Sequence, residues 1–159
     1  MHTTRCQSHS ERQTADIAAD LARRLPDGTV VLLFGDLGAG KTAFVRGFVE
    51  GTGIDPDEVS SPTFTIVQTY GGGRVQHVDL YRLGPAETDD LGLEELPDGG
   101  ALVCIEWADR LSRPIPGAVS VGIHDRGGDS RELVIDLPGE LELIALPGNP
   151  SVSGEAARP

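Results

Sequence analysis

Thr29-Val-Val-Leu-Leu-Phe-Gly-Asp-Leu-Gly-Ala-Gly-Lys-Thr42 is the stretch that decides the fold of this 159-residue chain. Its first part, Thr29 to Phe34, is a short, almost continuous apolar run, typical of a strand buried on both faces. The remainder matches the whole phosphate-binding pattern G-x-x-x-x-G-K-[ST]. Apolar side chains then recur at helical spacing from Ala43 to about Gly51. Strand, glycine-rich loop and helix in this order predict an α/β domain with a phosphate site at the start of the helix.

Lys41 is the only lysine in the chain, and all other basic residues except histidine are arginines. The planar fork of an arginine would not fit the space between the β- and γ-phosphates that a P-loop lysine occupies. This use of lysine argues against an accidental match. We expect Lys41 to reach the phosphates and the Thr42 hydroxyl to bind Mg²⁺. The loop residues expected to bind nucleotide are Gly35, Asp36, Gly38, Ala39, Gly40, Lys41 and Thr42.

Composition excludes several classes of protein. Hydrophobic residues make up 38% and charged residues 24%, which indicates a soluble globular domain. The net charge of −12 argues against a protein that holds nucleic acid by itself, because phosphate contacts need clustered Lys and Arg. Two cysteines are too few for a disulfide framework or a zinc site. No apolar stretch suits a signal peptide or a membrane span, so we expect a cytoplasmic protein without a membrane partner.

The rest of the chain predicts one domain over residues 10–146, with disordered termini over 1–9 and 147–159. Ser10 and Gln13 resemble a capping box that opens a helix running to about Leu25. The other expected elements are a hairpin of residues 63–70 and 74–80, a short acidic helix over 85–96, a buried strand over 101–105, a C-terminal hairpin of 118–124 and 132–137, and a strand over 141–146.

A P-loop enzyme also needs a carboxylate that orients Mg²⁺ or the attacking water, usually at the C-terminal end of a buried parallel strand. Two residues meet this description. Glu106 follows the apolar run 101–105 and is the better match, while Asp79 lies at the end of the expected strand 74–80. Either could instead be a surface carboxylate at a strand end, so the choice between them stays open.

Four other features have a functional and a structural interpretation. Ser61-Pro62-Thr63 lies where several P-loop proteins keep a segment that senses the γ-phosphate, but the same pattern suits a turn entering a strand. Trp107, the single tryptophan, by itself indicates core packing. His77 is typical of a strand residue more than of a ligand. Arg82 suits a surface salt bridge better than an arginine finger.

Two missing segments narrow the choice of nucleotide and reaction. Guanine-specific P-loop proteins read the base with Asn-Lys-x-Asp, which cannot occur here because the single lysine is already in the loop. ATP is therefore favoured over GTP. Small-molecule kinases usually carry an arginine-bearing lid, and the chain has no basic lid segment.

Taken together, these segments resemble the TsaE family, the P-loop ATPases of bacterial tRNA threonylcarbamoyladenosine biosynthesis. The resemblance covers about residues 30–110, and its order and spacing both fit. The glycine-rich loop alone is common to many families, whereas the segments that accompany it are specific. The residues that carry the resemblance are Gly35–Thr42, Arg46-Gly47-Phe48, Ser61-Pro62-Thr63-Phe64-Thr65, His77-Val78-Asp79-Leu80-Tyr81-Arg82-Leu83 and Glu106-Trp107.

The resemblance implies a compact α/β domain whose mixed sheet has parallel strands at the nucleotide site and antiparallel strands beside them. It implies ATP and Mg²⁺ as cofactors, with Lys41 on the phosphates, Thr42 and Glu106 on the metal, and Asp79 in a catalytic or metal-orienting role. Ser61 and Thr63 would belong to the γ-phosphate-sensing segment, and Trp107 is counted with the nucleotide-binding residues.

The resemblance also implies that the chain does not make the modified base itself. It would support the TsaB–TsaD pair, which transfers threonylcarbamoyl to adenosine 37 of tRNAs reading codons that start with A, and ATP hydrolysis would reset that pair between turnovers. We expect weak ATPase activity alone and no tight tRNA binding by the isolated chain. Two alternatives from other classes are a stand-alone small-molecule kinase and a nucleotide-dependent interaction module with little hydrolysis.

Overall fold

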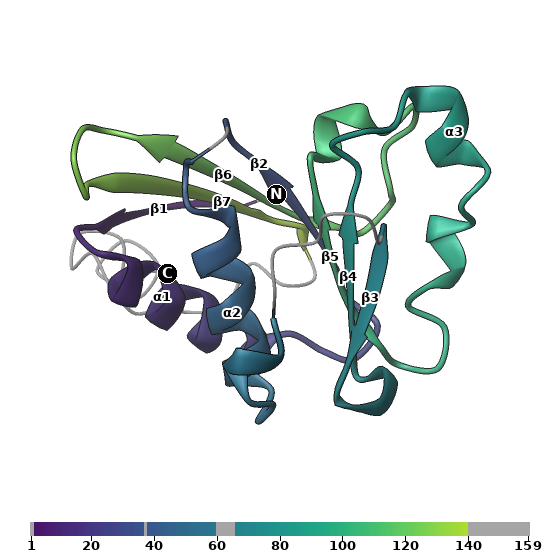
Figure 1. Ribbon diagram of the computed structural model, residues 1–159, viewed down its shortest axis with the longest axis horizontal. Coiled ribbons are helices and arrows are strands. Elements are labelled where there is room, and N and C mark those ends of the chain that lie inside the picture. The colour runs from purple at the N-terminus through teal and green to yellow at the C-terminus, as the bar shows by residue number, and fades with distance from the viewer. Residues whose placement is uncertain (1, 37, 60–65, 140–159) are drawn as a thin grey trace.

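A computed structural model describes residues 2–36, 38–59 and 66–139 of the chain. It is an α/β domain built on one seven-stranded sheet with the strand order β1-β7-β6-β2-β5-β4-β3 (Figure 1). The sheet is mixed, and helices flank it, as the sequence predicts. The strands are β1 (His2–Ser8), β2 (Val30–Phe34), β3 (Val67–Tyr70), β4 (Val75–Asp79), β5 (Leu102–Glu106), β6 (Val119–Asp125) and β7 (Arg131–Leu137).

The centre of the sheet is parallel. β2 pairs with β5 on one side and β6 on the other, and β4 continues the parallel set beyond β5. Alternate residues of β2 enter two separate cores, Val31 and Leu33 with α1 and α2, and Val30 and Leu32 on the opposite face. Because parallel strands share one direction, the C-terminal ends of β2, β5 and β4 meet at one edge of the sheet, where α/β proteins usually bind ligands.

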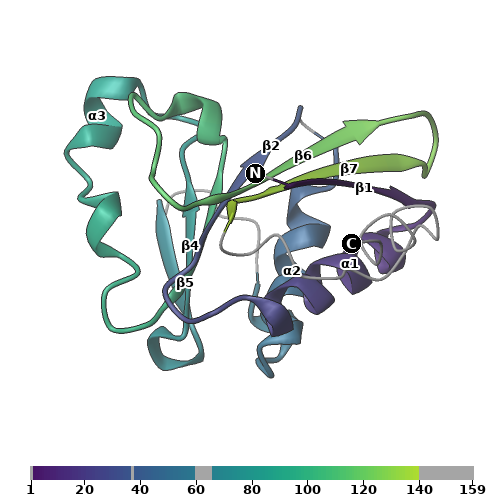
Figure 2. The ribbon, with the colours of Figure 1, turned by 180° about the vertical axis from the view of Figure 1, so that it is seen from behind.

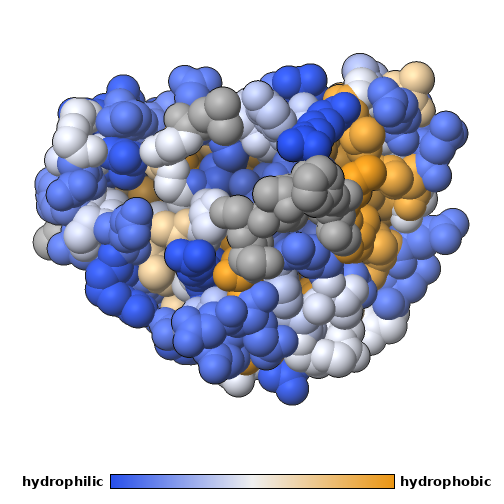
Figure 3. Space-filling model, in the orientation of Figure 1, coloured by the Kyte–Doolittle hydropathy of each residue, from blue (hydrophilic) through white to orange (hydrophobic). Residues whose placement is uncertain are grey.

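Antiparallel strands extend both sides of this centre. β3 and β4 form the expected hairpin, and β6 and β7 form the second one. The view from behind in Figure 2 shows β6, β7 and β1 side by side, above α1. In the space-filling view, partly buried hydrophobic side chains reach the surface beside β3 and α3 (Figure 3). Much of the rest of that face is hydrophilic, in keeping with the high net charge.

Helices α1 (Glu11–Arg24) and α2 (Lys41–Gly51) pack against each other on one face of the sheet. The Ser10 side chain accepts a hydrogen bond from the Gln13 backbone N–H at 3.0 Å, so the predicted cap is present. The contact between the helices is unusually close, because a Cβ at Gly47 would lie only 2.1 Å from the Ala15 carbonyl oxygen. α2, which begins where the phosphate-binding loop ends, therefore packs directly against the backbone of α1.

The prediction of a loose N-terminal segment over residues 1–9 is wrong. His2–Ser8 forms strand β1, which pairs antiparallel with the whole of β7 at the edge of the sheet. Its buried residues alternate, but they are Thr4, Cys6 and Ser8, which do not form an apolar pattern. Only the unpaired edge of β7, more than a hundred residues away, makes this segment a strand.

The acidic helix expected over residues 85–96 is also shorter than predicted. Helix α3 covers only Pro85–Asp89, and a separate 3-10 turn covers Leu93–Glu95. Gly92 lies between them with φ of 64°, a left-handed conformation that a continuous α-helix over this range could not contain. The strand expected over 141–146 and the terminal segment 147–159 lie outside the described residues. Within the described part, no helix is long and apolar enough to cross a membrane.

Candidate nucleotide site

The glycine-rich loop leads from the end of β2 into α2, which starts at Lys41 with Gly40 as its N-cap. Two of its glycines have left-handed backbones, Gly38 with φ of 79° and Gly40 with φ of 112°. Gly35 is required for a different reason, because a Cβ there would lie 2.9 Å from the Ile123 carbonyl oxygen on β6. The loop therefore turns tightly against the sheet, and a side chain in place of these glycines would displace it.

Arg131, the first residue of β7, ties the loop to the far hairpin. Its Nε donates to the Ala39 carbonyl at 2.9 Å, and its Nη2 donates to the Gly38 carbonyl at 3.3 Å. These two hydrogen bonds keep the Gly38 and Ala39 carbonyls turned toward the Arg131 guanidinium. No local signal in the sequence marks Arg131, because an arginine shortly after Gly127-Gly128 has the pattern of a hairpin surface residue.

Lys41 is almost fully buried, with 6% of its surface exposed. Its ammonium donates to the Gly35 carbonyl and, at 3.1 Å, to the Asp36 carbonyl. It also lies 3.9 Å from the centre of the Trp107 ring, a cation–π contact. Burial lowers the pKa of Lys41, and the nearby carboxylates of Glu106 and Asp79 oppose this shift. Among the described residues, the partners of the buried Lys41 ammonium are backbone carbonyls and an aromatic ring, and no carboxylate forms an ion pair with it.

Trp107 is partly buried and packs against the core cluster that contains Val30 and Ile105, and its ring also contacts Lys41. Its φ of 57° makes it the only non-glycine residue with a positive φ in the described part of the chain. This backbone turns its ring over Lys41 and beside Tyr81, whose ring centre is 4.9 Å away. The Arg110 guanidinium lies 5.9 Å from the Trp107 ring. Strained backbones of this kind are frequent at functional sites.

The two candidate carboxylates are neighbours. Asp79 ends β4, Glu106 ends β5, and the strand register pairs them directly. Asp79 Oδ1 accepts a hydrogen bond from the Tyr81 backbone N–H at 2.9 Å. Burial raises the pKa of Asp79, and the charge of Glu106 adds to that rise, while the Tyr81 N–H bond opposes it. The sequence presented these residues as rivals, whereas the fold brings both to the edge where Lys41 lies.

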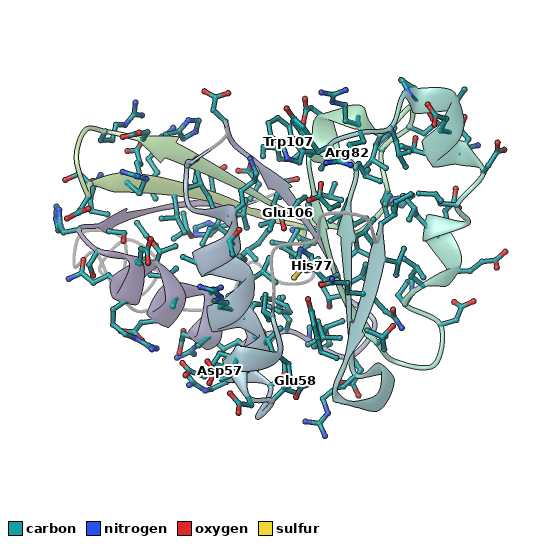
Figure 4. All side chains as sticks on the ribbon, in the orientation of Figure 1. Asp57, Glu58, His77, Arg82, Glu106 and Trp107 are labelled. Carbon is teal, nitrogen blue, oxygen red and sulfur yellow. The ribbon has the colours of Figure 1, made fainter. Side chains whose placement is uncertain are left out.

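His77 lies on the same strand as Asp79 and is 2% exposed. Its Nε2 is 2.5 Å from Glu106 Oε2, and its Nδ1 is 3.2 Å from the Tyr70 hydroxyl. In Figure 4, Trp107, Glu106 and His77 lie one below another along the ends of β5 and β4. His77 is a strand residue, as its sequence context predicts, but its contact with the candidate catalytic carboxylate has no signal in the sequence.

These residues fit a nucleotide-bound magnesium ion better than a protein-only metal site. The described residues contain no cluster of three or more His, Cys, Asp or Glu side chains that could hold a metal by themselves. Mg²⁺ in nucleotide sites is usually held by one or two carboxylates together with phosphates and water. Thr42 in the first turn of α2, and Glu106 and Asp79 at the strand ends, have the oxygen groups that such a set would need. Ser61 and Thr63, the expected γ-phosphate-sensing residues, lie outside the described residues.

Comparison with known proteins decides the family. Residues 8–133 match the family model described as threonylcarbamoyl adenosine biosynthesis protein TsaE. The chain belongs to the TsaE family. The chain therefore has the role of this family in the threonylcarbamoyladenosine modification of tRNA.

Individual relatives agree with this placement. The chain is 37% identical over 134 residues to the tRNA threonylcarbamoyladenosine biosynthesis protein TsaE of Treponema pallidum, covering 82% of this chain and 98% of that protein. It is 40% identical over 130 residues to the corresponding protein of Bacillus subtilis, covering 80% and 81% of the two chains. Among solved structures, the crystal structure of Bacillus subtilis YdiB aligns with a TM-score of 0.72 at 29% identity, over 98% of this chain and 95% of that one.

Proposed function

We propose that this chain is the ATP-binding and ATP-hydrolysing subunit of threonylcarbamoyladenosine synthesis, and that it acts together with TsaB and TsaD. In this proposal the TsaB–TsaD pair modifies adenosine 37 of tRNAs reading codons that start with A, and ATP hydrolysis resets the pair between turnovers. Because the substrate of that pair is tRNA, we place this work in the cytoplasm. The observation that carries the proposal is the convergence of Lys41, Asp79 and Glu106 at the C-terminal ends of the parallel strands.

Lys41 is suited to hold phosphates. Its ammonium is positioned at the loop by carbonyls and by the Trp107 ring, partners that an anion can replace or join. The loop ends at the N-terminus of α2, where free backbone N–H groups and the helix dipole favour negative charge. Both features favour a polyphosphate over a neutral ligand. The single lysine leaves no guanine-reading segment, which supports ATP as the nucleotide.

Thr42, Glu106 and Asp79 are the residues we assign to Mg²⁺. The bound ion would supply positive charge on the β- and γ-phosphates as negative charge develops there. The carboxylates also repel each other, since the charge of Glu106 raises the pKa of Asp79. A cation between them and the phosphates would relieve that repulsion. Glu106, buried and held in place on a central strand, is the better candidate for the main catalytic carboxylate.

Dependence on a partner is supported by what surrounds the site. Within the described residues there is no basic segment of the kind that closes a kinase site over phosphates. Completion of a phosphoryl-transfer site by a partner can raise its rate by about 10³-fold or more. The net charge of −12 disfavours direct capture of tRNA and favours docking on protein.

ATP hydrolysis measured with and without purified TsaB and TsaD tests the proposal. We expect slow turnover alone, marked stimulation by the pair, and multi-turnover tRNA modification only when this chain and ATP are both present. Glu106→Ala should lower stimulated hydrolysis by about 10²-fold, because it removes a metal-positioning group, with ADP binding nearly unchanged. Full multi-turnover modification without this chain, or tight tRNA binding by the isolated chain at physiological salt, contradicts the proposal.

A further inference from the structure

A continuous row of polar side chains crosses three strands beneath the nucleotide site. Glu106 on β5 meets His77 on β4 at 2.5 Å, and the other ring nitrogen of His77 lies 3.2 Å from the hydroxyl of Tyr70 on β3. Tyr70 in turn donates to the Gln68 amide oxygen. His77 and Tyr70 are buried, so this row of side chains is covered by the rest of the protein and is not exposed to solvent.

Burial makes these contacts consequential. A buried imidazole or carboxylate that lacks a partner loses its hydration without replacement, whereas hydrogen bonds offset that loss. Both nitrogens of the His77 ring have a partner, so neither its rotation nor its displacement is free. The backbone of His77 is also fixed, because β4 is paired on both sides, with β3 and β5. An imidazole held at both ring nitrogens keeps the group that contacts its Nε2, the Glu106 carboxylate, in a fixed position.

That support holds one oxygen of Glu106 and leaves the other available. Glu106 Oε2 accepts from His77 Nε2, while Oε1 accepts no hydrogen bond from any described residue. Asp79 is held differently, by the backbone N–H of Tyr81. A backbone N–H two residues further on therefore orients Asp79, whereas the orientation of Glu106 depends on a side chain from the neighbouring strand.

We propose that His77 is a positioning residue that fixes the Glu106 carboxylate so that Oε1 serves the nucleotide-bound Mg²⁺, with Tyr70 fixing the His77 ring in turn. This inference rests on the proposed function of the site. Outer partners of this kind typically contribute about 10-fold to 100-fold in metal affinity or activity. His77 therefore acts through Glu106 and does not need to touch the nucleotide.

Kinetics separate a positioning role from a general structural one. In the complex with TsaB and TsaD, His77→Ala should lower kcat for ATP hydrolysis by about 10-fold or more, with the KM for ATP within about twofold of wild type, because Lys41 and the loop remain. His77→Gln keeps an N–H donor in reach of Glu106 and should recover most of the loss. His124→Ala, at an exposed histidine on β6, is the matched control and should behave as wild type.

A second readout does not depend on activity. Long-range ¹H–¹⁵N NMR spectra of the isolated wild-type chain should show a proton on His77 Nε2, whose resonance shifts when Glu106→Gln removes the carboxylate charge. If the kinetics fail because the proposed ATPase function is wrong, this spectrum still tests the contact. A folded His77→Ala variant with wild-type kcat, equal losses in His77→Ala and His77→Gln, or a His77 Nε2 without a proton would each overturn the inference. If His77→Ala does not fold, His77→Gln and the spectra decide.

Discussion

Gly47 in α2 offers the most direct physical test of how the phosphate-binding loop is positioned. A methyl group at this position would lie 2.1 Å from the Ala15 carbonyl oxygen and 2.4 Å from the Ala15 Cα. Both atoms belong to the backbone of α1, so no side-chain rotation relieves the clash. Since ordinary contacts are near 3.5 Å, Gly47→Ala must push the two helices apart by roughly 1 Å or more.

The expected magnitude is the difference of two effects. Overpacking of this kind costs up to about 3 kcal/mol, and Gly→Ala in a helix interior returns about 1 kcal/mol through higher helix propensity. We therefore expect the free energy of unfolding to fall by about 2 kcal/mol. For a chain of this size that corresponds to a decrease in Tm of about 4–8 °C. ATP affinity should fall as well, because α2 begins at Lys41 and carries the loop with it.

Urea denaturation and thermal unfolding measure the stability change, and calorimetric titration measures ATP binding. Gly139→Ala is a suitable control, since no atom of the described residues lies within 4 Å of a Cβ there. Ala15→Gly combined with Gly47→Ala should not restore stability, because the clash is with backbone atoms that a glycine at position 15 retains. A Gly47→Ala variant as stable as wild type, or full rescue by Ala15→Gly, would refute the close packing of α1 on α2.

Further predictions concern the phosphate-binding loop, the residues that contact it and the nucleotide that it binds. Lys41→Ala should weaken ATP binding by at least about 2 kcal/mol, the scale of a lost charge-assisted contact, and unchanged calorimetric affinity in the folded variant would contradict the role of Lys41. Arg131→Leu should raise the Kd for ATP about 10-fold, because it frees the Gly38 and Ala39 carbonyls that Arg131 holds, while the KM for tRNA in the full reaction stays unchanged. Calorimetry checks the Kd, and Arg113→Leu, at an exposed arginine, is the control. Trp107 fluorescence should change when ATP is added, since its ring contacts Lys41, and the change should be absent in Lys41→Ala. ATP should outcompete GTP for a fluorescent nucleotide, and tighter binding of GTP would contradict the reasoning from the single lysine.

The strand, loop and helix around Lys41 could be predicted because their signals are local. An apolar run, glycines at the turning points and a helix with regular spacing lie within about twenty consecutive residues, and each constrains the backbone where it occurs. The strand ends that carry Asp79 and Glu106 were visible for the same reason. Their roles in binding and catalysis stay predictions until they are measured.

What the sequence by itself determined is therefore the phosphate-binding unit and the residues that end the buried strands. Only the tertiary structure decided which distant residues support them, because that depends on strand order and register. The pairing of β4 with β5 places His77 on Glu106, 29 residues away. The C-terminal hairpin brings Arg131 to the carbonyl of Ala39, 92 residues away. Likewise, His2–Ser8 is a strand only because β7 offers it an open edge, and no local pattern contains that information.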